Sequence, residues 1–370
     1  MLTSPNSERS LVDHLLETLR ALPDVNDVQV VVREASAAER AAHARIDAVI
    51  DLRVAGKSLE LMIEANNSLY PRDARNAFWV WTMKRAPARP AESAQGPDRV
   101  PMLIATSISP GAKEFLRHEG VGYFDSGGSL FIPAKGAYLY IDKPPPKALA
   151  KAIRNLYSGR RAQVLHALLN QHDVWVGVKD LAEQSHVSPA TASQVLTKLE
   201  RFDWLESEGQ GPTKKRRLRE PAALLDAWSQ QVATERPLSM RRFYVPGLRA
   251  EDLTDKLAQA LEARGVDYAI THEVAAQRYA PFLSSVSQAR CRLVPGTAAD
   301  AALVDLNARP VAEGTNLFLI DVSSPDELLF RQKLNGVWLA SPIQVYLDLL
   351  RGEGRAKDLA AHLRRERIGF

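Results

Sequence analysis

Residues 181–200 read LAEQSHVSPATASQVLTKLE, and their pattern predicts two helices joined by a tight turn in the middle of the chain. The turn at His186–Ser188 separates two helical patterns. Ser188 is a good N-cap residue, and Pro189 suits the first helical position because its missing N–H needs no partner there. With the helical pattern that precedes it, the sequence predicts three helices, at 161–170, 178–185 and 189–202.

The last of these helices has two chemically different faces. Its apolar positions recur at helical spacing and are Ala192, Val195, Leu196, Leu199 and Phe202. The opposite face offers short hydroxyl, amide and cationic side chains, whose size suits contact with base edges and phosphates in the major groove. The predicted DNA contacts here are Ser188, Thr191, Ser193, Gln194, Thr197 and Lys198.

A polar segment with two glycines and a proline, Glu206–Thr213, leads directly into the basic run KKRRLR at 214–219. This order predicts a β-hairpin with a polar tip and a basic return strand. Five cations in six residues can neutralise several phosphates and release their counterions. The predicted phosphate contacts are Lys214, Lys215, Arg216, Arg217 and Arg219.

The whole stretch resembles the winged helix-turn-helix of bacterial transcription regulators, in the style LAxxxxVSxxTxSxxLxxLE. The resemblance implies a recognition helix at 189–202 and a wing at 206–219 that bind double-stranded DNA. Each half has a plain structural alternative, since a Ser-Pro turn between helices is common and a basic run is usually a solvated face. Their occurrence together, in order and at short spacing, favours DNA binding.

Two alternating runs, 45–54 and 58–66, predict a β-hairpin near the N-terminus with one apolar and one acidic face. Carboxylates on adjacent strands can hold Mg²⁺ for phosphodiester hydrolysis. The alternative is that these acids are ordinary solvent-facing residues of an amphipathic hairpin. The polar residues on the shared face are Asp47, Asp51, Glu60, Glu64 and Asn66.

This hairpin resembles the PD-(D/E)xK fold of restriction enzymes and Holliday-junction resolvases. That family reads (Asp/Glu)-x-Lys in the second strand, where this chain reads Glu64-Ala65-Asn66 and lacks the lysine that helps to activate water. The resemblance therefore implies a catalytically degenerate site at Asp47, Asp51, Glu64 and Asn66, with no cofactor. The alternative is an Mg²⁺-dependent, structure-specific endonuclease, and only in that case is a metal expected.

Two further segments, VGYFDSGGSL at 121–130 and SPIQVYLDLL at 341–350, resemble AbiEi-type proteins. These are the antitoxin and transcription-regulator members of type IV toxin–antitoxin systems. The resemblance implies transcription regulation and a cognate toxin as partner. Because operators are often palindromic, we also expect a homodimer.

Composition and length suit an α/β protein of several domains. The chain has 370 residues, 45% hydrophobic and 25% charged, with a formal net charge of +4. The proline-rich segment Lys143–Lys147 is a good boundary. We predict a restriction-endonuclease-like α/β domain at 1–147, a winged helix-turn-helix domain at 148–236 and a mixed α/β domain at 237–370 that binds a partner or a second copy.

The remaining sequence features exclude several classes. A single cysteine, Cys291, rules out an intramolecular disulfide. No apolar run approaches the roughly 18 residues of a membrane span, and the N-terminus does not resemble a secretory signal. We therefore expect a cytoplasmic protein that has no membrane partner.

Overall fold

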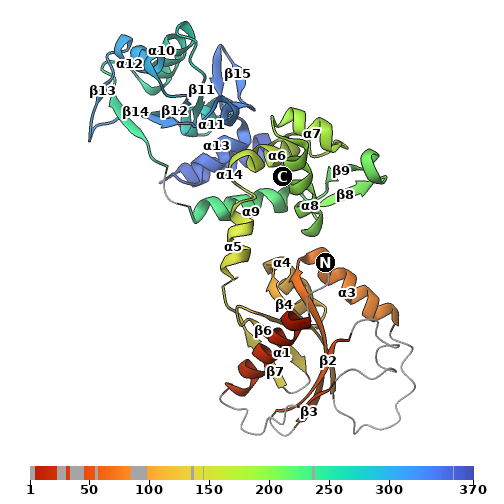
Figure 1. Ribbon diagram of the computed structural model, residues 1–370. Helices are drawn as coiled ribbons and strands as arrows, with labels where there is room; N and C mark the ends of the chain where they lie inside the picture. The colour runs from red at the N-terminus through yellow and green to blue at the C-terminus, as the bar shows by residue number, and fades with distance from the viewer. Residues whose placement is uncertain are drawn as a thin grey trace. The chain divides into compact units, whose positions relative to one another are not determined.

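The computed structural model describes residues 5–22, 31–33, 46–54, 57–84, 98–134, 137–144, 146–235, 238–352 and 354–370. The chain is mixed α/β, as the sequence predicts, and both large sheets contain parallel and antiparallel strands (Figure 1). Its contacts group it into two compact units. One holds residues 1–153 with Thr197–Asp203, and the other holds Arg154–Leu196 with Trp204–Phe370.

The first unit contains a seven-stranded sheet whose strands lie in sequence order. The strands are β1 (Val31–Arg33), β2 (Ala48–Val54), β3 (Lys57–Leu69), β4 (Asp98–Ile108), β5 (Gly122–Asp125), β6 (Leu130–Ala134) and β7 (Ala137–Ile141). The three central strands β3, β4 and β5 run parallel, while the neighbours on both sides pair antiparallel. The predicted hairpin at 45–66 is the antiparallel pair β2–β3.

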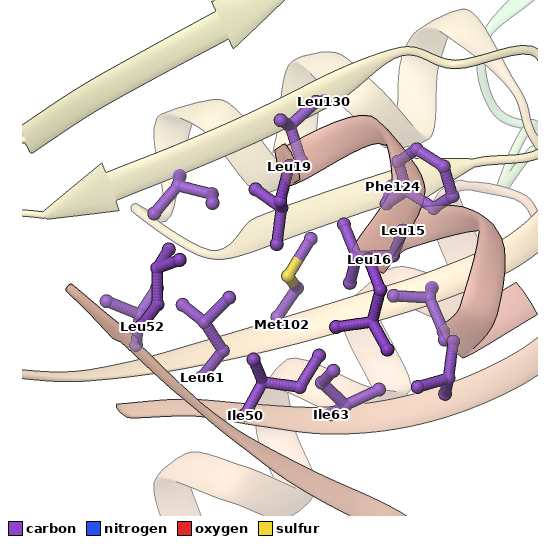
Figure 2. Close-up of a cluster of buried hydrophobic side chains, with 14 of the residues drawn as sticks. Leu15, Leu16, Leu19, Ile50, Leu52, Leu61, Ile63, Met102, Phe124 and Leu130 are labelled. Carbon is purple, nitrogen blue, oxygen red and sulfur yellow. The ribbon is translucent and has the colours of Figure 1, made fainter. Parts of the chain in front are cut away.

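Helices cover this sheet on both sides, because its central strands bury alternate residues in two separate clusters. Helix α1 (Pro5–Arg20) packs Leu15 and Leu19 against one face, where Met102 and Phe124 lie (Figure 2). Helices α3 (Pro71–Lys84) and α4 (Pro110–His118) contribute to a second cluster on the other face. That cluster contains Leu103, the strand neighbour of Met102.

The predicted alternation of β2 holds with one exception. Ala48, Ile50 and Leu52 all join the α1 cluster, as expected. Strict alternation over the run 45–54 predicts Ile46 on the same face, and that prediction is wrong, because Ile46 packs instead with Val49 and the partly buried Met62. It precedes the first residue of β2, so the strict twofold alternation does not extend to it.

The second unit begins with a mostly helical region. Its elements include α6 (Gly159–Asn170), α7 (Val178–Gln184), β8 (Leu205–Glu208), β9 (Lys215–Leu218) and α9 (Pro221–Ala233); α5 (Lys147–Arg154) precedes them. Helix α8 (Pro189–Arg201) lies between α7 and β8 in the chain, and its last turn is grouped with the first unit. The helices predicted at 161–170, 178–185 and 189–202 are confirmed to within two residues at each end.

A second seven-stranded sheet follows, in the order β13-β10-β14-β12-β11-β16-β15. Its strands are β10 (Arg241–Tyr244), β11 (Tyr268–Thr271), β12 (Ala289–Leu293), β13 (Arg309–Pro310), β14 (Leu317–Asp321), β15 (Gln332–Leu334) and β16 (Val337–Leu339). The helices are α10 (Ala250–Ala263), α11 (His272–Tyr279), α12 (Thr297–Asp305), α13 (Pro342–Leu349) and α14 (Ala356–Leu363). A π-helical turn, Arg364–Ile368, continues α14.

A buried ion pair ties α13 to this sheet. Arg292 of β12 donates from Nε to Oδ2 of Asp348 at 2.8 Å and from Nη2 to Oδ1 at 2.5 Å. Thr271 of β11 donates to the same carboxylate at 2.6 Å. Burial alone would raise the pKa of Asp348, but the Arg292 guanidinium outweighs burial and holds that pKa well below its usual range. The pair therefore stays charged inside the unit.

Among the described residues, no helix combines the length and the apolar character needed to cross a bilayer.

Candidate nucleic-acid interface

Helix α8 begins as its sequence indicates. Ser188 accepts a hydrogen bond at its Oγ from the backbone N–H of Thr191, 3.2 Å away, and thereby caps the helix. Its hydroxyl also lies 3.0 Å from the Thr191 hydroxyl. Both side chains are thus held in place at the exposed start of the helix.

The buried face of α8 is the predicted one. Ala192, Val195, Leu196 and Leu199 are fully buried, whereas Phe202, expected on the same face, is only partly buried. Phe202 follows the last helical residue, Arg201, so helical spacing no longer places it. The apolar stripe is therefore confirmed from Ala192 to Leu199, about two turns of the helix.

The predicted base-contacting residues all lie outside this buried stripe. Ser188, Gln194 and Thr197 are exposed, and Thr191, Ser193 and Lys198 are partly exposed. Thr197 and Lys198 fall in the last turn of α8, which is grouped with the first unit. The polar surface that belongs to the second unit is therefore the N-terminal half of α8, from Ser188 to Gln194.

Strands β8 and β9 form the antiparallel hairpin that the sequence predicts. Glu206 lies opposite Arg217, and Glu208 lies opposite Lys215. The connection contains Gly209, whose φ of +77° favours glycine. A Cβ there would also lie 3.3 Å from the backbone oxygen of Thr213. The glycine is therefore needed for the tight approach of the two strands at the tip.

A third backbone segment joins this hairpin. Val176, in the connection between α6 and α7, pairs with Arg216 of β9 through two backbone hydrogen bonds of 2.8 and 2.9 Å. The order along the chain is thus helix α6, bridge, helices α7 and α8, and hairpin β8–β9 (Figure 1). Sequence reasoning missed the bridge, although the run Val174-Trp175-Val176 has the β-branched and aromatic character that indicates it.

The five cations of the basic run differ in exposure and in their contacts. Lys215 and Arg219 are exposed, and Lys214 and Arg217 are partly exposed. Arg217 donates from Nη2 to Oε2 of Glu206 at 2.6 Å, and its guanidinium lies 5.0 Å from the ring centroid of Trp175. Arg219 donates to Glu220 at 3.2 Å.

Arg216 stands apart from the other four cations. It is 8% exposed, and its Nη1 lies 3.4 Å from the backbone oxygen of Lys214. A phosphate contact requires an accessible guanidinium. We therefore leave Arg216 out of the candidate interface, although the sequence pattern included it.

The polar residues of the β2–β3 hairpin lie on one side of the first sheet but differ in burial. Asp47 is exposed, and its Oδ2 accepts a hydrogen bond from the backbone N–H of Ala65 at 2.8 Å. Asp51 is partly buried and lies opposite Glu60. Glu60 in turn pairs with Arg99 at 2.6 Å. Asp47 thus links the two ends of the hairpin, whereas Glu60 links β3 to β4.

Glu64 and Asn66 complete the set. Glu64 is 5% exposed. The Nδ2 of Asn66 is buried, and within the described residues it has no hydrogen-bond partner. No group of three or more His, Cys, Asp or Glu side chains in the described part of the chain is placed to hold a metal ion. The structure therefore brings the predicted residues onto one face without assembling them into a metal-binding cluster there.

Two histidines of the second unit are deeply buried. His166 of α6 stacks on Phe330 with ring centroids 4.7 Å apart, and its Nε2 contacts the hydroxyl of Ser341. Burial lowers the pKa of His166 to about 3 and that of His272 to about 4. His272 also has a φ of +56°. His272 is only 1% exposed.

No protein-family model, curated protein or solved structure matches this chain.

Proposed function

We propose that the chain is a double-stranded DNA-binding protein that regulates transcription through a winged helix formed by α6, α7, α8 and the β8–β9 hairpin. The observation that carries the proposal is the bridge between Val176 and Arg216. It joins the segment between α6 and α7 to the hairpin through a single β-bridge, and helix, bridging segment, two helices and hairpin is the element order of a winged helix. In this proposal α8 is the recognition helix and β8–β9 is the wing.

Each part has a distinct task in the proposed complex. Thr191, Ser193 and Gln194 project from the side of α8 that is not buried, and hydroxyl and amide groups of this size read base edges in the major groove. Lys214 and Lys215, where the connection at the tip of the wing enters β9, would contact phosphates. Phosphate contacts fix the register of the protein on the duplex, and base contacts give sequence preference.

We propose that the first unit is a nuclease-like domain that has lost catalytic activity. In support, β2 and β3 carry Asp51 and Glu64 on one side of a mixed sheet, while Asn66 stands where the resembled family has lysine. Asparagine supplies no positive charge to stabilise an attacking hydroxide. In this proposal the unit is a scaffold and not a catalyst.

The wider biological assignment rests on the sequence resemblance to AbiEi-type antitoxins. On this resemblance we propose a cytoplasmic, antitoxin-like regulator with a cognate toxin. We also propose that the protein binds DNA as a homodimer on a palindromic operator.

Selection from a pool of random duplexes tests the proposal. The full chain should enrich a defined sequence over several rounds, and Gln194→Ala should relax the preference at one or two base pairs, each worth about 1–3 kcal/mol. Lys256→Ala on α10, an exposed cation outside the winged helix, is the matched control. A chain that retains no duplex in any round is not a DNA-binding protein.

A further inference from the structure

The first unit contains a cavity of about 370 Å³ between α4 and the segment that follows β7. Its size falls within the range of small-ligand sites. Proline and isoleucine side chains form part of the wall, and the charged lining residues are Lys113, Arg117, Asp142 and Lys143. All of these residues belong to the first unit.

Lys113 is a fixed cation in this wall. It is only 6% exposed. Its Nζ lies 2.7 Å from Oδ2 of the fully buried Asp125 and donates to the Ser129 hydroxyl at 2.7 Å. Asp142 is 3.8 Å from the same Nζ. Burying a lysine is costly unless it is paired, and these contacts hold its charge in one position.

The other two cations have no such partner. Neither Arg117 nor Lys143 is paired with a carboxylate within the described residues. Arg117 contacts the Tyr140 hydroxyl, and its guanidinium lies 5.3 Å from the Tyr140 ring centroid. Tyr140 is 41% exposed and offers a flat aromatic surface beside the guanidinium.

A buried hydroxyl interacts electrostatically with some of these groups. The Tyr123 hydroxyl is buried and has no hydrogen-bond partner in the described part of the chain. Burial raises the pKa of Tyr123 well above its ordinary value, Arg117 lowers it, and Tyr140 and Asp142 raise it further. The hydroxyl therefore keeps its proton and interacts electrostatically with Arg117 and Asp142, which line the cavity.

We propose that this cavity binds a phosphate monoester, held by Arg117, Lys143 and Lys113. At neutral pH a phosphate monoester carries between one and a half and two negative charges, which matches the two cations that lack a carboxylate. The guanidinium of Arg117 can donate two parallel hydrogen bonds to phosphate oxygens. The ester group then lies toward Tyr140, where a flat base can stack.

Calorimetric titration of the full chain tests this site with inorganic phosphate, with a nucleoside monophosphate, and with a short oligonucleotide that does or does not carry a 5′-phosphate. Arg117→Ala and Lys143→Ala should each weaken binding at least about tenfold, the loss of one charge-assisted hydrogen bond. Lys147→Ala is the matched control, an exposed lysine four residues further along that does not line the cavity, and it should leave binding unchanged.

Whether Asp142→Asn strengthens or weakens binding shows whether the cavity prefers an anion. Asp142→Asn removes the carboxylate that lines the cavity, so it should tighten binding of an anion. Binding of the nucleotide identifies a free ligand, while binding of the 5′-phosphorylated strand alone identifies a strand end; both support the phosphate site if Arg117→Ala weakens them at least about tenfold. Failure of every phosphate to bind, or weaker binding in Asp142→Asn, would overturn the proposal.

Discussion

Arg217 and Glu206 face each other across the β8–β9 pair and are joined by a hydrogen bond of 2.6 Å. This contact neutralises one of the cations that the sequence assigns to phosphate binding. Removing the carboxylate should release the cation without changing the hairpin. Glu206→Gln is therefore expected to strengthen duplex binding and to steepen the dependence of log K on log salt by up to about 0.9, the contribution of one phosphate contact. Fluorescence anisotropy over a range of salt concentrations measures both quantities. Weaker binding by this variant would show that the ion pair itself is needed in the complex.

The Ser188 cap should contribute measurably to stability. Ser188→Ala removes the acceptor for the Thr191 N–H and is expected to lower the free energy of unfolding by about 1 kcal/mol. Urea unfolding followed by circular dichroism gives this value. Ser193→Ala, a serine on the same helix that does not cap it, should cause no loss. Equal stability of Ser188→Ala and the parent chain would mean that the cap is not important.

The buried pair Arg292–Asp348 should be much more costly to break. Asp348→Asn leaves the Arg292 guanidinium inside the second unit with a neutral partner, and similar changes cost about 3–5 kcal/mol. Thermal unfolding should show a large fall in Tm. The exposed pair Arg264–Asp305 provides the contrast, since Asp305→Asn should cost no more than about 1 kcal/mol. A small effect at Asp348 would contradict the role given to this pair.

Acid should destabilise the second unit through its buried histidines. The pKa values of His166 and His272 in the folded chain are about 3 and about 4, below the usual value of 6.5. At pH values between these folded-state pKa values and 6.5, the unfolded chain binds protons that the folded chain does not. The free energy of unfolding therefore falls as the pH drops below about 6.5. Near pH 5 each histidine contributes a slope of about 1.4 kcal/mol per pH unit. His166→Asn should remove one such contribution from urea midpoints measured between pH 5 and 6.5. An unchanged slope would indicate that His166 is accessible to protons.

The first unit should not cleave nucleic acid. Incubation of the chain with Mg²⁺ or Mn²⁺ and with plain or branched duplexes is expected to leave all substrates intact, because Asn66 replaces the lysine of the resembled family. A contaminating nuclease would act equally in an Asp51→Ala sample. Cleavage that disappears in Asp51→Ala would instead establish the endonuclease alternative.

Local patterns in the sequence predict much of this fold. Pro189 and the apolar spacing after it place α8, and alternation places β2 and β3. Strand β12 escapes notice because it contains Arg290 and Arg292, and the burial of Arg292 depends on Asp348, 56 residues away. No local pattern contains such a partner.

The candidate interface also depends on long-range contacts that local sequence patterns do not contain. The basic run is visible in the sequence, but which of its cations face outward depends on strand register. Arg216 is buried because its backbone pairs with Val176, and Arg217 meets Glu206 because Gly209 allows a tight connection. Composition alone treats these cations as equivalent.

The sharpest test of phosphate binding by the β8–β9 hairpin is the salt dependence of duplex binding in a Lys214→Ala/Lys215→Ala double variant. If the β8–β9 hairpin binds the phosphate backbone, the slope of log K against log salt should flatten by about 0.9 for each lost contact. The control Lys256→Ala should keep the slope of the parent chain. Identical affinity and slope in the double variant and the parent chain would contradict the account.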